Sequence, residues 1–168
     1  MLLNYINPFV EAAFSVFSTM LSCPLTRKPV CRVDAMQTEF EVSGVVGLSG
    51  RAVGTVVLSL DREVALSATA ALLGERPASI DPQVVDAVGE LANMIGGAAK
   101  AKLEQYAMSL SLPNVIVGRN HAIRFPSCST PICVPFVSPW GPLCLSVGLV
   151  ETENGQVHCE ATHLANAR

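Results

Sequence analysis

Residues 81–105 read DPQVVDAVGELANMIGGAAKAKLEQ, and this stretch decides how the rest of the chain is organised. It predicts one long helix, with the Asp81 carboxylate as N-cap and Pro82 in the first turn. At roughly 100° per residue, its apolar side chains gather on one face, which we expect to pack on a core. That face comprises Val84, Val88, Leu91, Ile95, Ala98 and Ala99.

The opposite face of this helix carries a polar stripe. Its members on the same projection are Asp86, Glu90, Asn93, Gly97 and Lys100. Glu90 and Asn93 lie one turn apart, so an acid and an amide point the same way. We take the stripe as the candidate working surface. The residues alone leave open a second interpretation, a polar face that is only solvated, as most such faces are.

The segments on either side of this helix predict two more helices and several strands. Before it, helical or strand patterns cover residues 8–21 (helix capped by Asn7), 30–36 (edge strand), 40–48 and 52–60 (hairpin), and 62–73 (helix between Asp61 and Gly74). After it, strand patterns cover residues 114–117, 121–125, 132–137 and 143–150, the last two joined as a hairpin. The hairpins follow from the turn-forming residues between their strands.

This order of elements predicts an α+β fold, with about three helices packed on one face of a mostly antiparallel sheet. Both halves of the chain follow a helix-then-strands plan, which would allow pseudo-symmetry. A chain of 168 residues suits one buried domain. We expect that domain to span residues 1–150 and residues 151–168 to form a polar C-terminal tail.

Composition argues against nucleic acid and membrane partners. The net charge is -3, only 15% of the residues are charged, and no run of lysine and arginine is present. The apolar N-terminus lacks a basic leader and is interrupted by Asn4, Asn7, Pro8 and Glu11. We therefore expect no signal peptide and no membrane insertion.

Cysteine and histidine spacings predict no metal site. The six cysteines form no CxxC pair, and the three histidines are not at ligand spacing from them. We interpret the cysteines as small buried hydrophobes, which makes a reducing cytoplasm the default location. The histidines show no nucleophile partner in the sequence, so a hydrolase triad has no support.

The run DAVGELANMIGGAAKAKLE, centred on Glu90-x-x-Asn93, resembles the signature helix of the CheX proteins in the CheC/CheX/FliY group of chemotaxis phosphatases. The segments NPFVEAAFSVFSTML, GVVGLSGRAVGTVVLSL and SLPNVIVGRNHAI resemble other CheX segments. Glu-x-x-Asn alone is a weak motif, and the longer match gives it weight. The resemblance implies a pseudo-symmetric CheC/CheX-like fold and a homodimer.

The resemblance also implies a reaction, the dephosphorylation of a CheY-like response regulator that carries phosphate on aspartate. Glu90 is then expected to anchor a lysine of the regulator, and Asn93 to orient the attacking water. The regulator would supply Mg²⁺, so we expect no cofactor in this chain. Gly89, Gly96 and Gly97 would let the partner approach closely.

Two departures from the family pattern bear on the site. CheX-like sequences often carry an amide where Ala98 stands, and we expect this to be a packing change. CheC proteins carry a second Glu-x-x-Asn in their first helix, where this chain has Glu11 and Phe14. One site per chain is therefore expected.

The remaining stripe residues are possible partner contacts. Asp86 could steer the partner's lysine and Lys100 could pair with its acidic surface, although we favour a surface or helix-start charge for Asp86 and a solvated side chain for Lys100. The competing function is a non-catalytic module that docks on a response regulator or another two-component signalling protein.

Overall fold

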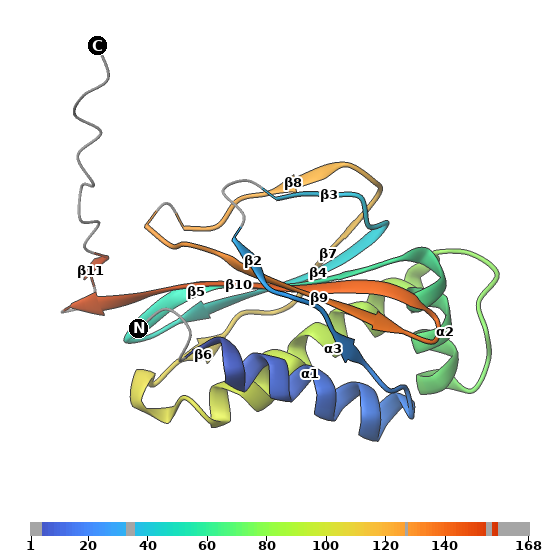
Figure 1. The fold of residues 1–168 in the computed structure, drawn as a ribbon, viewed down its shortest axis with the longest axis horizontal. Helices are drawn as coiled ribbons and strands as arrows, with labels where there is room; N and C mark the ends of the chain where they lie inside the picture. Colours follow the sequence, from blue (N-terminus) through green and yellow to red (C-terminus); the bar gives the residue numbers. More distant parts are fainter. Residues whose placement is uncertain (1–4, 33–35, 127, 154–155, 158–168) are drawn as a thin grey trace, which may run out of the picture.

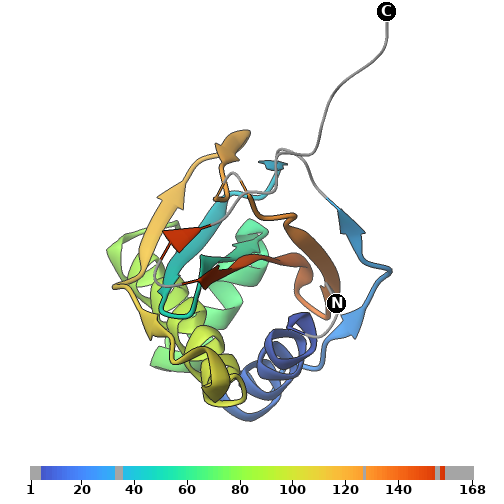
Figure 2. The same cartoon turned by 90° about the vertical axis from the view of Figure 1, so that its left-hand side faces the viewer.

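Three helices pack on the same face of an antiparallel sheet, as both ribbon views show (Figures 1 and 2). The structure, a computed structural model, describes residues 5–32, 36–126, 128–153 and 156–157. The helices are α1 (Ile6–Leu21), α2 (Arg62–Leu73) and α3 (Pro82–Ala101), followed by a short 3-10 helix, η1 (Glu104–Tyr106). The predicted α+β class is confirmed.

Within the described residues the main sheet has nine strands, and every pairing in it is antiparallel. Its central order is β1-β9-β10-β5-β4-β6, while β11, β2 and β7 pair with β10, β9 and β4. The bounds are β1 (Thr26–Arg27), β2 (Cys31–Arg32), β4 (Val42–Ser49), β5 (Ala52–Leu60), β6 (Ser109–Leu110), β7 (Asn114–Val117), β9 (Ile132–Ser138), β10 (Gly141–Glu153) and β11 (Gln156–Val157). A separate pair, β3 (Met36–Thr38) and β8 (His121–Ile123), lies on the side of the sheet away from the helices (Figure 1).

Helix α3 begins where the sequence predicts and ends earlier. The Asp81 carboxylate accepts the Val84 N–H at 3.0 Å, which confirms the N-cap. The helix stops at Ala101 and does not continue to Gln105. Leu103, only 4% exposed, turns into the core. The chain beyond it is tied to the β4–β5 turn because the Arg51 N–H donates to the Tyr106 carbonyl at 2.8 Å.

The ends of α2 match the prediction, whereas the start of α1 does not. Asp61 accepts the Glu63 N–H at 3.1 Å, and Gly74 ends α2 with φ +81°. Helix α1 begins at Ile6 after Tyr5, without a side-chain cap. The expected capping role of Asn7 is wrong, because Asn7 already lies inside the first turn.

Some strand boundaries differ from those expected. The strand expected over residues 30–36 is divided between β2 and β3, which belong to different sheets, and residues 33–35 lie outside the described residues. Strand β8 ends at Ile123, two residues short of the expected end at residue 125. Strand β10 continues past the expected end at Val150 to Glu153. Its extension is held by Thr152, whose N–H donates to the Arg51 carbonyl at 2.8 Å. Residues 154–155 and 158–168 of the expected tail lie outside the described residues.

The interpretation of the cysteines needs a correction. Cys133 of β9 and Cys144 of β10 are joined by a disulfide, with their Cα atoms 6.6 Å apart. The β9–β10 register places Cys133 opposite Ser146, two residues from Cys144, so both cysteines lie on the same face of adjacent strands. Sequence spacing alone does not show that register. Cys23 is a free buried thiol, as expected, and burial raises its pKa.

No helix in the described part of the chain has both the length and the apolar character that crossing a bilayer demands.

Candidate functional site

The inner face of α3 holds the helix rigidly against the rest of the protein. Val88, Leu91 and Ile95 are fully buried in the core. The helix contacts α1, α2 and strands β4 and β5. Ala98, which we expected on the packing face, is exposed. The alanine at this position is therefore not a change in core packing.

The predicted polar stripe lies on the outer face of α3. Asp86 and Glu90 are exposed, and Asn93, Gly97 and Lys100 are half-buried. Within the described residues, none of the four polar side chains on the stripe forms a hydrogen bond or ion pair with the chain. By contrast, Lys102 at the end of α3 forms an ion pair with Glu11 of α1, with 2.6 Å between Nζ and Oε2. The stripe is thus free to bind a partner.

Gly89 and Gly96 serve the chain's own packing, which corrects the expectation that they face a partner. Both are buried. A β-carbon on Gly89 would lie 3.3 Å from Cγ2 of Val115, and one on Gly96 would lie 3.1 Å from Cδ2 of Leu110. The glycines let the β6–β7 segment lie close to α3. A β-carbon on Gly97 would meet only Cδ1 of Leu110, at 3.8 Å, so the surroundings of this glycine are more open.

Asn93 lies on the helix surface between these two glycines. It follows Gly89 by four residues and precedes Gly96 by three, so the three positions share one side of α3. The β6–β7 segment therefore runs beside Asn93 and accounts for its half-buried state. Glu90, one turn earlier and further around the helix, stays exposed.

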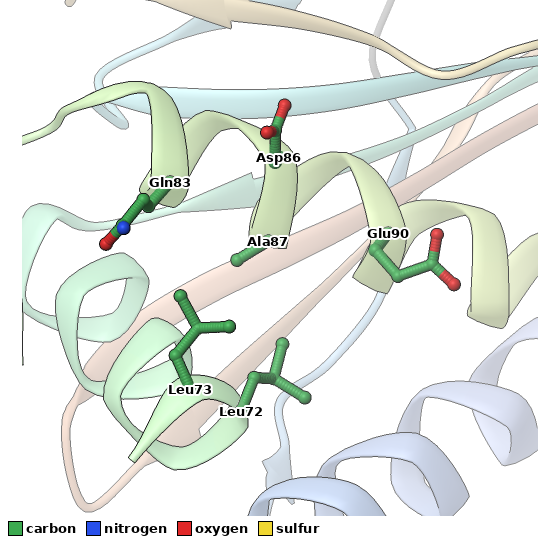
Figure 3. A pocket seen from close by; sticks show the side chains of 6 residues that line it. All are labelled: Leu72, Leu73, Gln83, Asp86, Ala87 and Glu90. Atoms are coloured by element: carbon green, nitrogen blue, oxygen red, sulfur yellow. The ribbon is translucent and has the colours of Figure 1, made fainter. Parts of the chain in front are cut away.

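A groove of about 440 Å³ opens between α2 and α3 beside the stripe (Figure 3). Leu72 and Leu73, from the last turn of α2, point toward α3, whereas Asp86 points away from them. The full lining is Leu72, Leu73, Gln83, Asp86, Ala87 and Glu90. The groove thus has an apolar wall on α2 and is bordered on α3 by two residues of the stripe, Asp86 and Glu90. Neither helix pattern predicts this groove, because the angle between the two helices is not encoded in either one.

One histidine does have a serine partner, contrary to the expectation from sequence. Nε2 of His121 lies 2.9 Å from Oγ of Ser43, and Nδ1 lies 2.6 Å from the Gly118 carbonyl oxygen. A carbonyl only accepts, so Nδ1 carries a proton, and in a neutral imidazole Nε2 then accepts from Ser43. Ser43 is fully buried and also bonds Ser59 at 2.8 Å. Because no substrate can reach Ser43, the contact is structural.

Within the described residues, no group of three or more histidine, cysteine, aspartate and glutamate side chains is arranged to hold a metal ion.

Comparison with known proteins shows the family of this chain. Residues 42–137, more than half of the chain, match the family described as Chemotaxis phosphatase CheX. This chain belongs to the CheX family. The CheY-P phosphatase CheX of Thermotoga maritima is 27% identical over 123 residues, which cover 71% of this chain and 79% of that protein.

Solved structures of CheX proteins resemble this chain over most of its fold. The chemotaxis protein CheX of Vibrio vulnificus is 30% identical, with a TM-score of 0.80 over 86% of this chain and 98% of that one. A chain from the CheX–CheY–BeF₃–Mg²⁺ complex of Borrelia burgdorferi is 26% identical, with a TM-score of 0.69 over 88% of this chain and 98% of that one.

Proposed function

We propose that this protein is an aspartyl-phosphate phosphatase that dephosphorylates a CheY-like response regulator. The observation that carries the proposal is the pairing of Glu90 and Asn93. They lie one turn apart on the outer face of a rigidly packed helix, and in the described residues neither side chain has a partner within the chain. Membership of the CheX family and the solved complex of a CheX relative with CheY support the same assignment.

Glu90 is the proposed anchor for a lysine of the regulator. Its exposed carboxylate can reach into a partner's active site without giving up a contact of its own. A charge-assisted hydrogen bond to a lysine would fix the position of α3 on the regulator. The exposed carboxylate of Asp86 lies one turn earlier and would add to the attraction for a basic group.

Asn93 is the proposed catalytic group that orients water. An amide can accept a hydrogen bond from a water with its oxygen and donate one with its nitrogen. It also stays neutral beside the anionic phosphoryl group. The oriented water attacks phosphorus, the bond from phosphorus to the aspartate oxygen breaks, and inorganic phosphate leaves as the aspartate carboxylate is regenerated. Half-burial against the β6–β7 segment restricts the Asn93 side chain, which favours positioning.

The partner supplies the remaining chemistry in this proposal. We propose that Mg²⁺ and the lysine belong to the receiver domain, where they neutralise charge on the transferred phosphoryl group. This protein then needs no cofactor of its own. Gly97 and Lys100 continue the stripe beyond Asn93 and would contact the edge of the receiver.

Two further parts of the proposal rest on the family resemblance alone, a homodimeric state and a cytoplasmic location. The cysteines do not support the cytoplasmic location, because Cys133 and Cys144 are paired in a disulfide. Sedimentation equilibrium of the purified chain tests the homodimer.

The deciding experiment measures phosphate loss from the organism's own CheY, phosphorylated with acetyl phosphate, in the presence and absence of this protein. A catalytic amount should shorten the lifetime of the phosphorylated receiver. An unchanged lifetime overturns the phosphatase assignment. If the protein nevertheless binds CheY loaded with beryllium fluoride and Mg²⁺, the competing function, a docking module without catalysis, replaces it.

A further inference from the structure

The polar stripe of α3 is bracketed by two exposed leucines. Leu112 is 86% exposed and Leu73 is 55% exposed, the two largest values among the exposed large hydrophobic residues of the described chain. The others in that group are Met20, Val30, Val117 and Val137. Exposed apolar side chains are ordinary when scattered singly. Two that flank a candidate site point instead to contact with a partner.

The position of Leu112 follows from the contacts of the glycines on α3. A β-carbon on Gly96 would meet Leu110, and one on Gly89 would meet Pro113. Seven helical residues rise about 10 Å, which is also the length of about three extended residues. The segment therefore runs antiparallel to α3, and Leu112 lies at a level between the two glycines, on the side of α3 that also carries Asn93.

The backbone that carries Leu112 is held in place. The Ser111 N–H donates to the Gly47 carbonyl at 2.9 Å, and Oγ of Ser111 accepts the Gly47 N–H at 2.9 Å. The same hydroxyl donates to the Leu112 carbonyl at 2.9 Å. Pro113 restricts the Leu112 backbone from the other side. A side chain on a fixed backbone loses less entropy on binding than one on a mobile loop, so Leu112 is suited to be an anchor.

Leu73 lies on the other side of the stripe. It is the last residue of α2 and lines the groove that Asp86 and Glu90 border on α3 (Figure 3). Gly74 follows it and ends the helix, so the leucine projects from the helix end next to α3.

We propose that Leu112 and Leu73 are the two apolar anchors that hold a receiver domain over Glu90 and Asn93. This inference rests on the proposed function, because the reaction brings a phosphorylated aspartate of a folded domain to Asn93. A helix is only about 10–12 Å wide, whereas a standard interface covers about 800 Å² on each partner. A receiver seated on α3 therefore covers both flanks. It must present apolar surface on both sides of its acidic active site.

The leucines and the stripe have different roles in this arrangement. The stripe orients the receiver and acts on the phosphoryl group, while the leucines contribute affinity by burying apolar area. The leucines touch neither the attacking water nor the phosphoryl group, so their contacts are the same before and during the reaction. Their loss raises KM and leaves kcat unchanged.

The test compares wild type, Leu112→Ala and Leu73→Ala with a matched control, Val137→Ala. Val137 is 41% exposed on β9, next to the buried Phe136 that packs on α1, so its side chain points away from the helices. Two quantities are measured: the affinity for the organism's own CheY loaded with beryllium fluoride and Mg²⁺, and the steady-state dephosphorylation of acetyl-phosphate-treated CheY. Thermal melts check that every variant is folded.

Each leucine variant should weaken binding and raise KM by about 5- to 30-fold with kcat unchanged, and Val137→Ala should equal wild type. Leucine variants with wild-type affinity and KM overturn the inference and leave the phosphatase assignment intact. If wild type binds CheY without dephosphorylating it, the proposed function fails, and weaker binding by the leucine variants still supports the anchors. If wild type does not bind CheY, the phosphatase assignment and the leucine anchors are both overturned.

Discussion

Gly44 of β4 lies directly against Ala92 of α3. A β-carbon on Gly44 would be 2.9 Å from the Ala92 Cβ and 3.0 Å from the Val88 carbonyl oxygen. Ala92 precedes Asn93, so this contact sets how closely the helix that carries the proposed site approaches the sheet. A side chain at position 44 would push α3 outward together with the whole polar stripe.

Gly44→Ala should lower the stability of the protein by about 1–3 kcal/mol, because the added methyl overpacks a core that has no room for it. The measurement is chemical denaturation followed by circular dichroism. Ser49→Ala, at the exposed end of the same strand, is the control and should be nearly neutral. A Gly44→Ala variant as stable as wild type would show that α3 is free to shift on the sheet.

Asn93→Ala should reduce kcat for receiver dephosphorylation by something on the order of 10²-fold, because one positioning group for the transition state is lost. Binding to beryllium fluoride-loaded CheY should stay close to wild type. Asn93→Asp places a negative charge next to the phosphoryl group and should be no faster than Asn93→Ala. Gln105→Ala, exposed beyond the end of α3, is the control. Full activity in Asn93→Ala would remove the assigned role.

Glu90→Gln keeps the shape of the side chain and removes its charge, so it should weaken binding of the receiver more than Asn93→Ala does. Because charge attraction is screened by salt, the difference from wild type should shrink as ionic strength rises. Isothermal titration with beryllium fluoride-loaded CheY at two salt concentrations measures both effects. Glu104→Gln, an exposed acid in η1, should behave like wild type. Equal affinities for Glu90→Gln and Asn93→Ala would rule out anchoring.

Gly97→Ala should separate stability from function. The new β-carbon meets only Leu110, at 3.8 Å, and alanine favours a helix over glycine by about 0.5–1 kcal/mol. The melting temperature should therefore rise. If a receiver approaches this position closely, KM for dephosphorylation should rise as well. A stabilised variant with wild-type KM would place Gly97 outside the interface.

Much of the fold could be predicted because its signals are local. The caps at Asp61 and Asp81 and the stop at Gly74 are set by neighbouring residues in the chain. The boundaries that were mispredicted depend on distant contacts. Helix α3 ends early where Leu103 enters the core, and β10 runs on where Thr152 bonds Arg51. The Cys133–Cys144 disulfide likewise depends on strand register.

The polar stripe can be predicted from the order of residues, since those that share a helix face follow from the helical repeat alone. Glu90 and Asn93 were found in this way. The surroundings of these two residues depend on how the elements pack in three dimensions. Packing turns Gly89 and Gly96 inward against the β6–β7 segment, brings that segment to the Asn93 side of α3, and opens the α2–α3 groove next to Glu90. These neighbours come from segments whose approach is set by packing, and a periodic pattern within one helix carries no information about it.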